Sequence, residues 1–207
     1  MPHSGPPPPL ILASASPRRR ALLEPTGLRF AVRPAGIPEH AMPGEDARSL
    51  VERLAEAKAR AIAERSQQDV VVLGSDTAVV LDGDILGKPR DPEHAVALLR
   101  RLTGRTHRVL TGVALVSERG ARADVLSVES RVAMRSAAEE ELRAYVATGE
   151  SLDKAGAYAL QGEGRRFIEY VEGSESNVIG LPLDETCALL RELGFSPRLP
   201  EALPEAP

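Results

Sequence analysis

An arginine-rich stretch near the N-terminus has the residue types of an anion-binding site. The sequence SASPRRR occupies residues 14–20, directly after the apolar run Leu10–Ala13. Ser16 and Pro17 are typical of an N-cap and a first helical turn, so the pattern predicts a strand followed by a helix that extends to Leu23. A helix N-terminus presents free backbone N–H groups and the positive end of the helix dipole, and both favour a bound phosphate.

Side chains of the same stretch supply further donors to such a phosphate. Serine hydroxyls donate single hydrogen bonds, and arginine guanidinium groups bind phosphate through two parallel bonds. Cations at the N-terminus of a helix are otherwise unfavourable, which favours a bound anion over a merely solvated face. We expect Arg20 to face solvent, and the predicted phosphate-binding residues are Ser14, Ser16, Arg18 and Arg19.

Two acidic residues are candidates for binding a metal ion or activating water. Asp76 lies in the sequence GSDT, which predicts a break between two apolar strands, and Glu39 lies on a loop after another predicted strand. Mg²⁺ prefers one or two carboxylates together with phosphate oxygens and waters, and this pair fits that preference. Taken alone, Asp76 is equally consistent with an Asx-turn, whereas Glu39 is more typical of an ordinary loop acid.

Three lysines are further candidate cations for the same site. Lys88 lies between a glycine and a proline in LGKP, Lys58 interrupts an alanine-rich helical pattern, and Lys154 lies in LDKAG. Each lysine by itself is more typical of a solvated surface. Together with the arginines and the two carboxylates, they predict a site for a triphosphate with Mg²⁺.

Composition excludes several other classes of function. The chain has 207 residues, a net charge of -4 and a pI of about 5.7, so it has no overall positive field to hold a nucleic acid. Aromatic residues make up 3% of the chain and tryptophan is absent, which argues against a base-stacking platform. We therefore expect no stable nucleic-acid binding.

Other common kinds of site are also missing from the sequence. Cys187 is the single cysteine, which excludes an internal disulfide and favours a reducing compartment. The four histidines show no metal-ligand spacing, and neither a P-loop nor a Ser-His-Asp pattern is present. No stretch approaches the roughly 20 apolar residues of a membrane span, so no membrane association is expected.

Apolar runs alternate with helical patterns along the chain, which is typical of an α/β layered fold. We expect a disordered Pro-rich leader over residues 1–9, a single α/β domain over 10–195 and a flexible tail over 196–207. The glycine-rich segment 151–180 is predicted to form loops of the kind that carry function. Helices are predicted at 17–23, 46–65, 92–102, 137–148 and 183–193, with strands at 10–13, 29–33, 69–73, 78–81, 107–118 and 124–135 and a tight turn at 82–83.

Long ordered motifs in this chain resemble those of the Maf proteins, a family of nucleoside triphosphate pyrophosphatases. They are LILASASPRRRALL, then VVLGSDTAVVLDGDILGKPRDPEHAVALLRRLTGRTHRVLTGVAL, then LDKAGAYALQGEGRRFIEYVEGSESNVIGLPL. The resemblance covers almost the whole chain and leaves out only the Pro-rich leader and the residues after Gly194. These motifs are specific because their residues and their order agree over most of the sequence.

The resemblance implies a fold, a reaction and a set of partners. The fold would be a mixed, bent sheet flanked by helices, with two lobes around a nucleotide-binding cleft. The reaction would be hydrolysis of a nucleoside triphosphate between its α and β phosphates, with Asp76 as the catalytic proton acceptor and Mg²⁺ or Mn²⁺ as the divalent cofactor. Family members are often cytoplasmic homodimers, so the same is expected of this chain.

Three positions separate two branches of the family. This chain has Arg18, Thr77 and Gln161, which resemble the branch that hydrolyses dTTP and UTP, whereas the branch acting on 7-methyl-GTP has Trp, Gln and Glu there. A cationic methylated guanine suits a Trp face and a carboxylate, while the amide of Gln161 can pair with the N–H and the carbonyl of a pyrimidine. The resemblance therefore implies a dTTP/UTP pyrophosphatase that also acts on modified pyrimidine nucleotides. The alternatives are a 7-methyl-GTP pyrophosphatase and a non-catalytic nucleotide-binding regulator of septum formation.

Overall fold

The computed structural model of the chain describes residues 7–205. Most of the predicted Pro-rich leader, residues 1–6, and the last two residues of the predicted tail lie outside the described part. Within it, the chain contains a seven-stranded mixed sheet with helices on both faces. The predicted α/β class, with a mixed and bent sheet, is confirmed.

The sheet joins a parallel part to an antiparallel part. Its strands run in the order β2-β1-β3-β5-β6-β7, and β4 pairs with β3 off this path. β1 is parallel to both β2 and β3, whereas the remaining pairs are antiparallel. The strands are β1 Leu10–Leu12, β2 Phe30–Val32, β3 Val71–Leu81, β4 Asp84–Leu86, β5 Thr106–Ser117, β6 Arg122–Met134 and β7 Ile168–Glu172.

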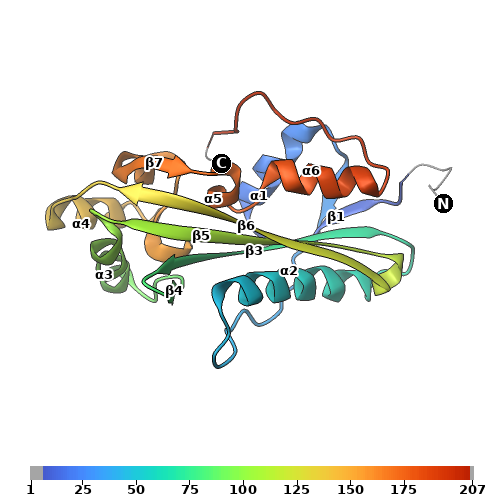
Figure 1. The fold of residues 1–207 in the computed structure, drawn as a ribbon, viewed down its shortest axis with the longest axis horizontal. Coiled ribbons are helices and arrows are strands. Elements are labelled where there is room, and N and C mark those ends of the chain that lie inside the picture. Colours follow the sequence, from blue (N-terminus) through green and yellow to red (C-terminus); the bar gives the residue numbers. More distant parts are fainter. Residues whose placement is uncertain (1–6, 206–207) are drawn as a thin grey trace.

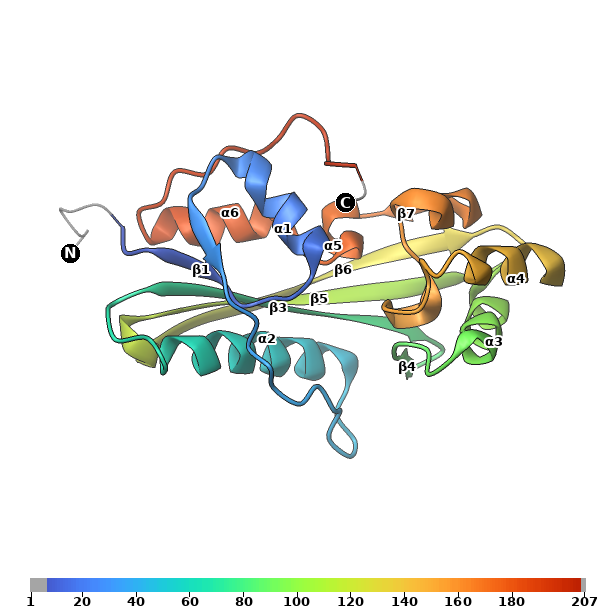
Figure 2. The same cartoon turned by 180° about the vertical axis from the view of Figure 1, so that it is seen from behind.

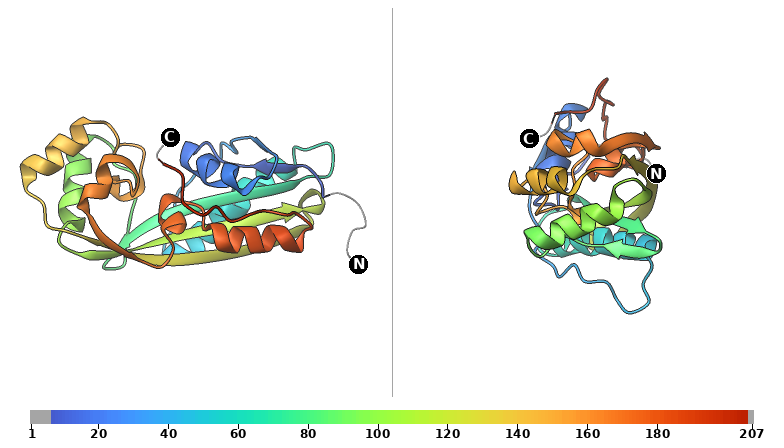
Figure 3. Two further views of the ribbon diagram at one scale, coloured as in Figure 1. Left: turned by 90° about the horizontal axis from the view of Figure 1, so that it is seen from above. Right: turned by 90° about the vertical axis from the view of Figure 1, so that its left-hand side faces the viewer.

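The three long strands β3, β5 and β6 extend along the molecule and connect its two ends, each of which carries its own group of helices (Figures 1 and 2). At one end α1 and α6 cover one face of the sheet and α2 covers the opposite face, while α3 and α4 gather with β4 and β7 at the other end. Figure 3 shows the two groups of helices from above, with the chain near the C-terminus between them. The helices are α1 Pro17–Leu23, α2 Ala47–Ala63, α3 Pro92–Leu102, α4 Glu139–Ala147, α5 Glu175–Ile179 and α6 Leu183–Glu192.

The predicted break at GSDT is wrong, because β3 runs without interruption from Val71 to Leu81. What changes along β3 is its neighbour on one edge. β1 pairs with residues 71–73 and β4 pairs with residues 79–81, whereas β5 pairs with residues 72–80 on the other edge. Among the described strands, residues 74–78 therefore pair on one side only, and Asp76 lies in that interval.

Gly74, which suggested the break, is required by close packing. A Cβ atom at Gly74 would lie 2.1 Å from the Ala55 carbonyl oxygen of α2, and a Cβ at Gly112 of β5 would lie 2.2 Å from the Val51 carbonyl oxygen. Both glycines thus let the backbone of α2 approach the sheet directly. Side chains alternate along a strand, so Asp76 shares the face of Gly74 and points toward α2.

The glycine-rich segment 151–180 is more regular than predicted. It contains β7 and α5 together with two short 3-10 helices, Ala155–Ala157 and Gly162–Phe167. β7 forms an edge of the sheet beside β6, with a register irregularity near Ala133. The chain from 195 to 205 then packs back on the domain, where the Arg198 amide donates to the Thr26 carbonyl at 3.0 Å.

Candidate active site

A cleft of about 1280 Å³ opens where β3 lacks a neighbour on one edge. Pockets for small molecules commonly occupy several hundred Å³, so a nucleotide fits. The structure brings together every residue that the sequence predicted for the site. The lining includes Ser14, Ser16, Arg18, Arg19, Glu39, Lys58, Asp76, Thr77, Lys88, Lys154 and Gln161.

The serines before α1 organise its first turn. The Ser16 hydroxyl oxygen accepts a hydrogen bond from the Arg19 backbone amide at 3.5 Å, and Pro17 occupies the first turn, as predicted. Ser14 Oγ accepts from the Ser16 amide at 3.1 Å and from Arg19 Nη1 at 3.4 Å. Since both oxygens act as acceptors in these contacts, their protons are left for an anion in the cleft.

Arg19 is fixed by contacts from all three of its guanidinium nitrogens. Nε donates to the Gly180 carbonyl at 2.8 Å and Nη2 donates to Thr77 Oγ1 at 3.0 Å, in addition to the Ser14 contact. Burial lowers the pKa of Arg19, an effect that the negative charges of Asp76 and Glu39 oppose. Arg19 is therefore a rigid cation at the N-terminal end of α1.

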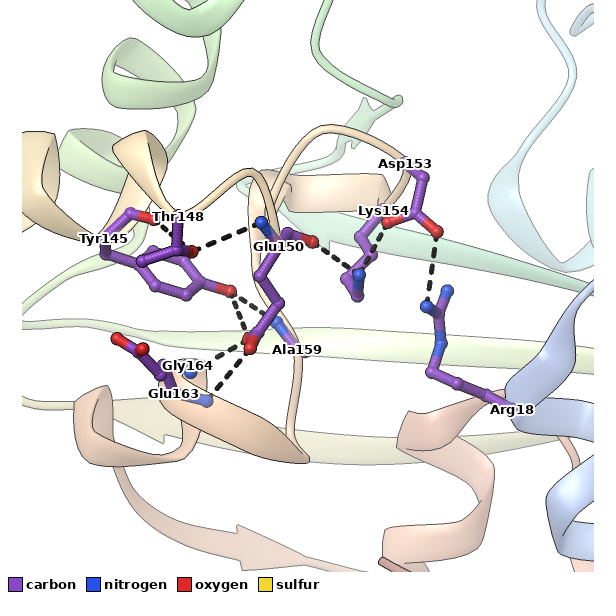
Figure 4. Close-up of polar contacts among 9 residues, drawn as sticks. All are labelled: Arg18, Tyr145, Thr148, Glu150, Asp153, Lys154, Ala159, Glu163 and Gly164. Carbon is purple, nitrogen blue, oxygen red and sulfur yellow. Dashed lines mark hydrogen bonds and ion pairs between the residues drawn. The ribbon is translucent and has the colours of Figure 1, made fainter. Parts of the chain in front are cut away.

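The other two arginines of the run behave differently. Arg20 is exposed and pairs with Glu24 at 2.7 Å, so the expectation that it faces solvent is confirmed. Arg18 Nη1 lies 3.4 Å from Asp153 Oδ2, and this contact reaches from α1 to the loop before the first 3-10 helix of segment 151–180 (Figure 4). The Arg18 side chain is 20% exposed, so a ligand can still reach it.

Lys154 is held by a network centred on Glu150 (Figure 4). Its ammonium group donates to the Glu150 carbonyl and, at 2.6 Å, to Asp153 Oδ1. The Glu150 carboxylate accepts from the Tyr145 hydroxyl at 2.9 Å and from the backbone amides of Glu163 and Gly164, both at 3.0 Å. This network ties the loop of Lys154 to the segment that carries Gln161.

A buried lysine joins the two carboxylates. Lys58 Nζ lies 2.6 Å from Asp76 Oδ1 and 2.6 Å from Glu39 Oε1, and the Lys58 residue is only 6% exposed. Lys88 Nζ lies 3.8 Å from the other oxygen of Glu39. Partial burial opposes ionisation of Glu39, but the hydrogen bond from Lys58 and the neighbouring positive charges outweigh it and hold the pKa of Glu39 below its usual range.

The donor set fits a hard divalent cation. Glu39 and Asp76 converge on one ammonium group, so their oxygens face a common region of the cleft. Over residues 7–205, no group of three or more His, Cys, Asp and Glu side chains could hold a metal by itself. Two carboxylates that leave further positions to phosphate oxygens and waters match the coordination habit of Mg²⁺.

Gln161 lines the cleft but contacts the chain near the C-terminus. Its Nε2 donates to the Pro204 carbonyl at 2.5 Å, and its Oε1 is buried with no hydrogen-bond partner among the described residues. One amide N–H is therefore used by Pro204, and the second remains for a ligand. Gln161 therefore has one N–H and one carbonyl oxygen that are without a partner among the described residues.

Comparison with known proteins places the chain in a family. Residues 9–193 match the model described as Maf-like protein. The chain belongs to the Maf family.

Relatives in the Maf family share about half of the residues. A protein of Hahella chejuensis (strain KCTC 2396) named dTTP/UTP pyrophosphatase is 51% identical over 188 residues, which cover 90% of this chain and 92% of that protein. A protein of the same name from Anaeromyxobacter dehalogenans (strain 2CP-C) is 52% identical over 191 residues, covering 91% and 95%. A solved nucleoside-triphosphatase / dITP/XTP pyrophosphatase of Mycobacterium abscessus is a distant structural neighbour, with a TM-score of 0.42 and 20% identity over 89% of this chain and 97% of that one.

Two residues that contact the site of this Maf protein, Asp153 and Gly180, were not predicted from the sequence. Asp153 contacts both Arg18 and Lys154, yet an acid beside a lysine has no distinctive pattern. Gly180 has φ of +127°, and a Cβ there would lie 3.4 Å from both Arg19 and Thr77. The family motif GSESNVIGLP was the one signal that pointed to Gly180.

No helix within residues 7–205 has the length and apolarity needed to span a bilayer.

A buried histidine supports the wall of the Maf cleft and makes stability depend on pH. His107 Nε2 lies 2.7 Å from the hydroxyl of Tyr158, which lines the cleft, and burial lowers the pKa of His107 from 6.5 to about 4. Between these pH values the unfolded chain binds a proton that the folded chain does not bind. The free energy of unfolding should therefore fall by about 3 kcal/mol from this group as pH drops through that window.

Urea unfolding across the same pH range measures this effect. The variant His107→Gln has no titrating ring, so it should lose that part of the pH dependence, whereas His40→Gln, at an exposed position, should keep it. Equal pH slopes in His107→Gln and the wild type would contradict the assignment.

Proposed function

We propose that this protein hydrolyses dTTP and UTP to the nucleoside monophosphate and pyrophosphate. The observation that supports this most strongly is the buried Lys58 bridge between Asp76 and Glu39, in a cleft that also contains Arg18 and Arg19. Cations hold a triphosphate, and carboxylates beside them supply a base and metal ligands. The relatives named dTTP/UTP pyrophosphatase support the same reaction.

The proposed chemistry assigns a role to each group. Water adds across the anhydride bond between the α and β phosphates, Asp76 accepts the water proton, and pyrophosphate leaves. The triphosphate is bound by Ser14, Ser16, Arg18, Arg19, Lys58, Lys88 and Lys154. Glu39 and Asp76 would hold Mg²⁺ or Mn²⁺, which would neutralise phosphate charge when bound.

Pairing with Lys58 keeps the two carboxylates in place before substrate arrives. The Lys58 side chain is only 8% exposed, and burying its ammonium group without anionic partners would cost free energy of folding. The ammonium group and the two carboxylates therefore stabilise one another. Lys58 also lines the cleft in which the triphosphate is proposed to bind, which suits electrostatic stabilisation of the transition state.

The base is proposed to be read by Arg18, Thr77 and Gln161. A preference for dTTP and UTP would distinguish the proposed function from its two alternatives. These are a 7-methyl-GTP pyrophosphatase and a non-catalytic regulator of septum formation that binds nucleotide. A cytoplasmic homodimer is the proposed setting, on the strength of the family resemblance.

Replacing Gln161 with Glu tests the reading of the base. The carboxylate cannot donate to a base carbonyl or to the Pro204 carbonyl, so kcat/KM for dTTP and UTP should fall by roughly tenfold to a hundredfold. The ratio of dTTP to 7-methyl-GTP hydrolysis should narrow at the same time. Gln68→Glu, at an exposed position, is the matched control and should leave these ratios unchanged. Unaltered ratios in Gln161→Glu would remove Gln161 from the base site.

A panel of nucleoside triphosphates tests the substrate class. Pyrophosphate release from dTTP, UTP, CTP and 7-methyl-GTP is measured with Mg²⁺, with Mn²⁺ and with chelator. We expect the highest kcat/KM for dTTP and UTP and loss of activity in chelator. Preference for 7-methyl-GTP would favour the first alternative, and binding without turnover of any nucleotide would favour the second.

A further inference from the structure

The hydroxyl group of Thr77 in β3 is part of a chain of hydrogen bonds that extends into the protein interior. Thr77 and Thr111 are directly opposite each other in the β3–β5 pair, and their hydroxyl oxygens lie 3.0 Å apart. Thr111 Oγ1 in turn lies 2.8 Å from the backbone carbonyl oxygen of Asn177, in α5. On the cleft side, Thr77 Oγ1 accepts a hydrogen bond from Arg19 Nη2 at 3.0 Å.

The proton of each hydroxyl in this chain is assigned by elimination. A carbonyl oxygen only accepts, so the single proton of Thr111 points to Asn177. Thr111 therefore has no proton to give to Thr77, and Thr77 must donate its own proton to Thr111. Since one lone pair of Thr77 accepts from Arg19, the Thr77 oxygen is left with one lone pair and no free proton.

Burial keeps this arrangement fixed. Thr111 and Asn177 are both 0% exposed, so no water can take over either hydrogen bond. The Asn177 side chain donates to the Val109 carbonyl at 3.1 Å and to Ser130 Oγ at 3.0 Å, which holds the residue against β5 and β6. Thr77 itself is half-buried and lines the cleft, so a ligand can reach its remaining lone pair.

We propose that Thr111 is a positioning residue for base selection, because it locks the Thr77 hydroxyl as a hydrogen-bond acceptor toward the nucleotide. This inference rests on the proposed function, in which Thr77 contacts the base. Uracil and thymine present a ring N–H that such an acceptor can bind. Cytosine carries a lone pair on the corresponding ring nitrogen, so a cytidine nucleotide would face the Thr77 lone pair with its own.

The consequence is that discrimination between UTP and CTP depends on a residue that touches neither nucleotide. Thr111→Val keeps the shape of the side chain but removes the acceptor for the Thr77 proton. The Thr77 hydroxyl then becomes free to turn and donate to the ring nitrogen of cytosine. Thr111→Ser restores a hydroxyl at the same place and should restore the lock.

The experiment compares kcat/KM for UTP and CTP in the wild type, Thr111→Val and Thr111→Ser. We expect the ratio of UTP to CTP to fall roughly tenfold in Thr111→Val and to return in Thr111→Ser. Inhibition by inorganic pyrophosphate should stay unchanged in both variants, because the phosphate-binding residues are intact. Thr111→Ala removes the same hydroxyl without placing a methyl group beside the Asn177 carbonyl, and it replaces the valine variant if that protein does not fold.

A double-mutant cycle identifies Thr77 as the route of the effect. In a Thr77→Val background, Thr111→Val should cause no further change in the ratio, because no Thr77 proton is left to redirect. A ratio unchanged by Thr111→Val, or an equal fall for both nucleotides, would overturn the inference while leaving the proposed function in place. Absence of UTP hydrolysis in the wild type would instead overturn the proposed function, and it would be seen before any variant is made.

Discussion

Replacing Asp76 with asparagine is expected to lower pyrophosphate release by roughly 10²- to 10⁴-fold, which is the usual contribution of a general base. The amide keeps the shape of the side chain but can neither accept the proton of water nor serve as an anionic metal ligand. The variant should still fold, because Lys58 keeps Glu39 as an anionic partner at 2.6 Å.

Pyrophosphate release under saturating dTTP measures this effect, together with the midpoint of thermal unfolding. Asp69→Asn makes the same chemical change at an exposed position and should behave as the wild type in both measurements. Turnover at the wild-type rate in Asp76→Asn would remove Asp76 from the catalytic role.

Replacing Arg19 with alanine is expected to weaken nucleotide binding by roughly tenfold to a hundredfold. A hydrogen bond from a charged donor contributes about 1.5 to 3 kcal/mol, and Arg19 lies at the N-terminal end of α1, where the phosphates are proposed to bind. Its contacts to Ser14, Thr77 and Gly180 hold that group rigid, so little conformational entropy is lost when an anion binds.

Arg20→Ala is the internal control for this prediction. Arg20 is the next residue of the same run, but it pairs with Glu24 and its side chain is 61% exposed, so its loss should change affinity little. Calorimetric titration with a non-hydrolysable dTTP analogue compares the two variants, and the unfolding midpoint of each reports any loss of structure. Equal losses in affinity would mean that the run acts only as general positive charge.

Local signals in the sequence predicted much of the fold correctly. Ser16 accepts a hydrogen bond from the third residue of the helix that follows, as its residue type indicated, and Asp46 and Asp91 make the same contact at α2 and α3. Such caps depend on neighbouring residues only, so they can be read without the tertiary structure. The strands β1 and β5 were also predicted correctly from their apolar runs.

Tertiary packing decided what the sequence could not indicate. Gly74 suggested a turn, but it lies within β3 because α2 needs a close approach to the sheet at that point. β7 was missed because its five residues carry little apolar pattern and mostly lie at an exposed edge. These features depend on residues far away in the chain, so no local pattern reports them.

The candidate site shows the same division. Its charged residues were predictable from their types and from the family motifs, and they do line one cleft. Burial of Lys58 was not predictable, because a lysine in an alanine-rich helix usually faces solvent. Thr111 and Asn177 lie within the family motifs, but their residue types gave no sign of the role proposed for them, which depends on where the Thr111 proton and the Asn177 backbone carbonyl point.

Product analysis of dTTP hydrolysis tests the central claim most directly. The wild-type protein is incubated with dTTP and Mg²⁺, and the nucleotide, pyrophosphate and orthophosphate products are separated and quantified. The proposed reaction predicts dTMP and pyrophosphate in equal amounts, with no dTDP formed along the way. Release of orthophosphate with dTDP, or bound dTTP that is recovered intact, would contradict it.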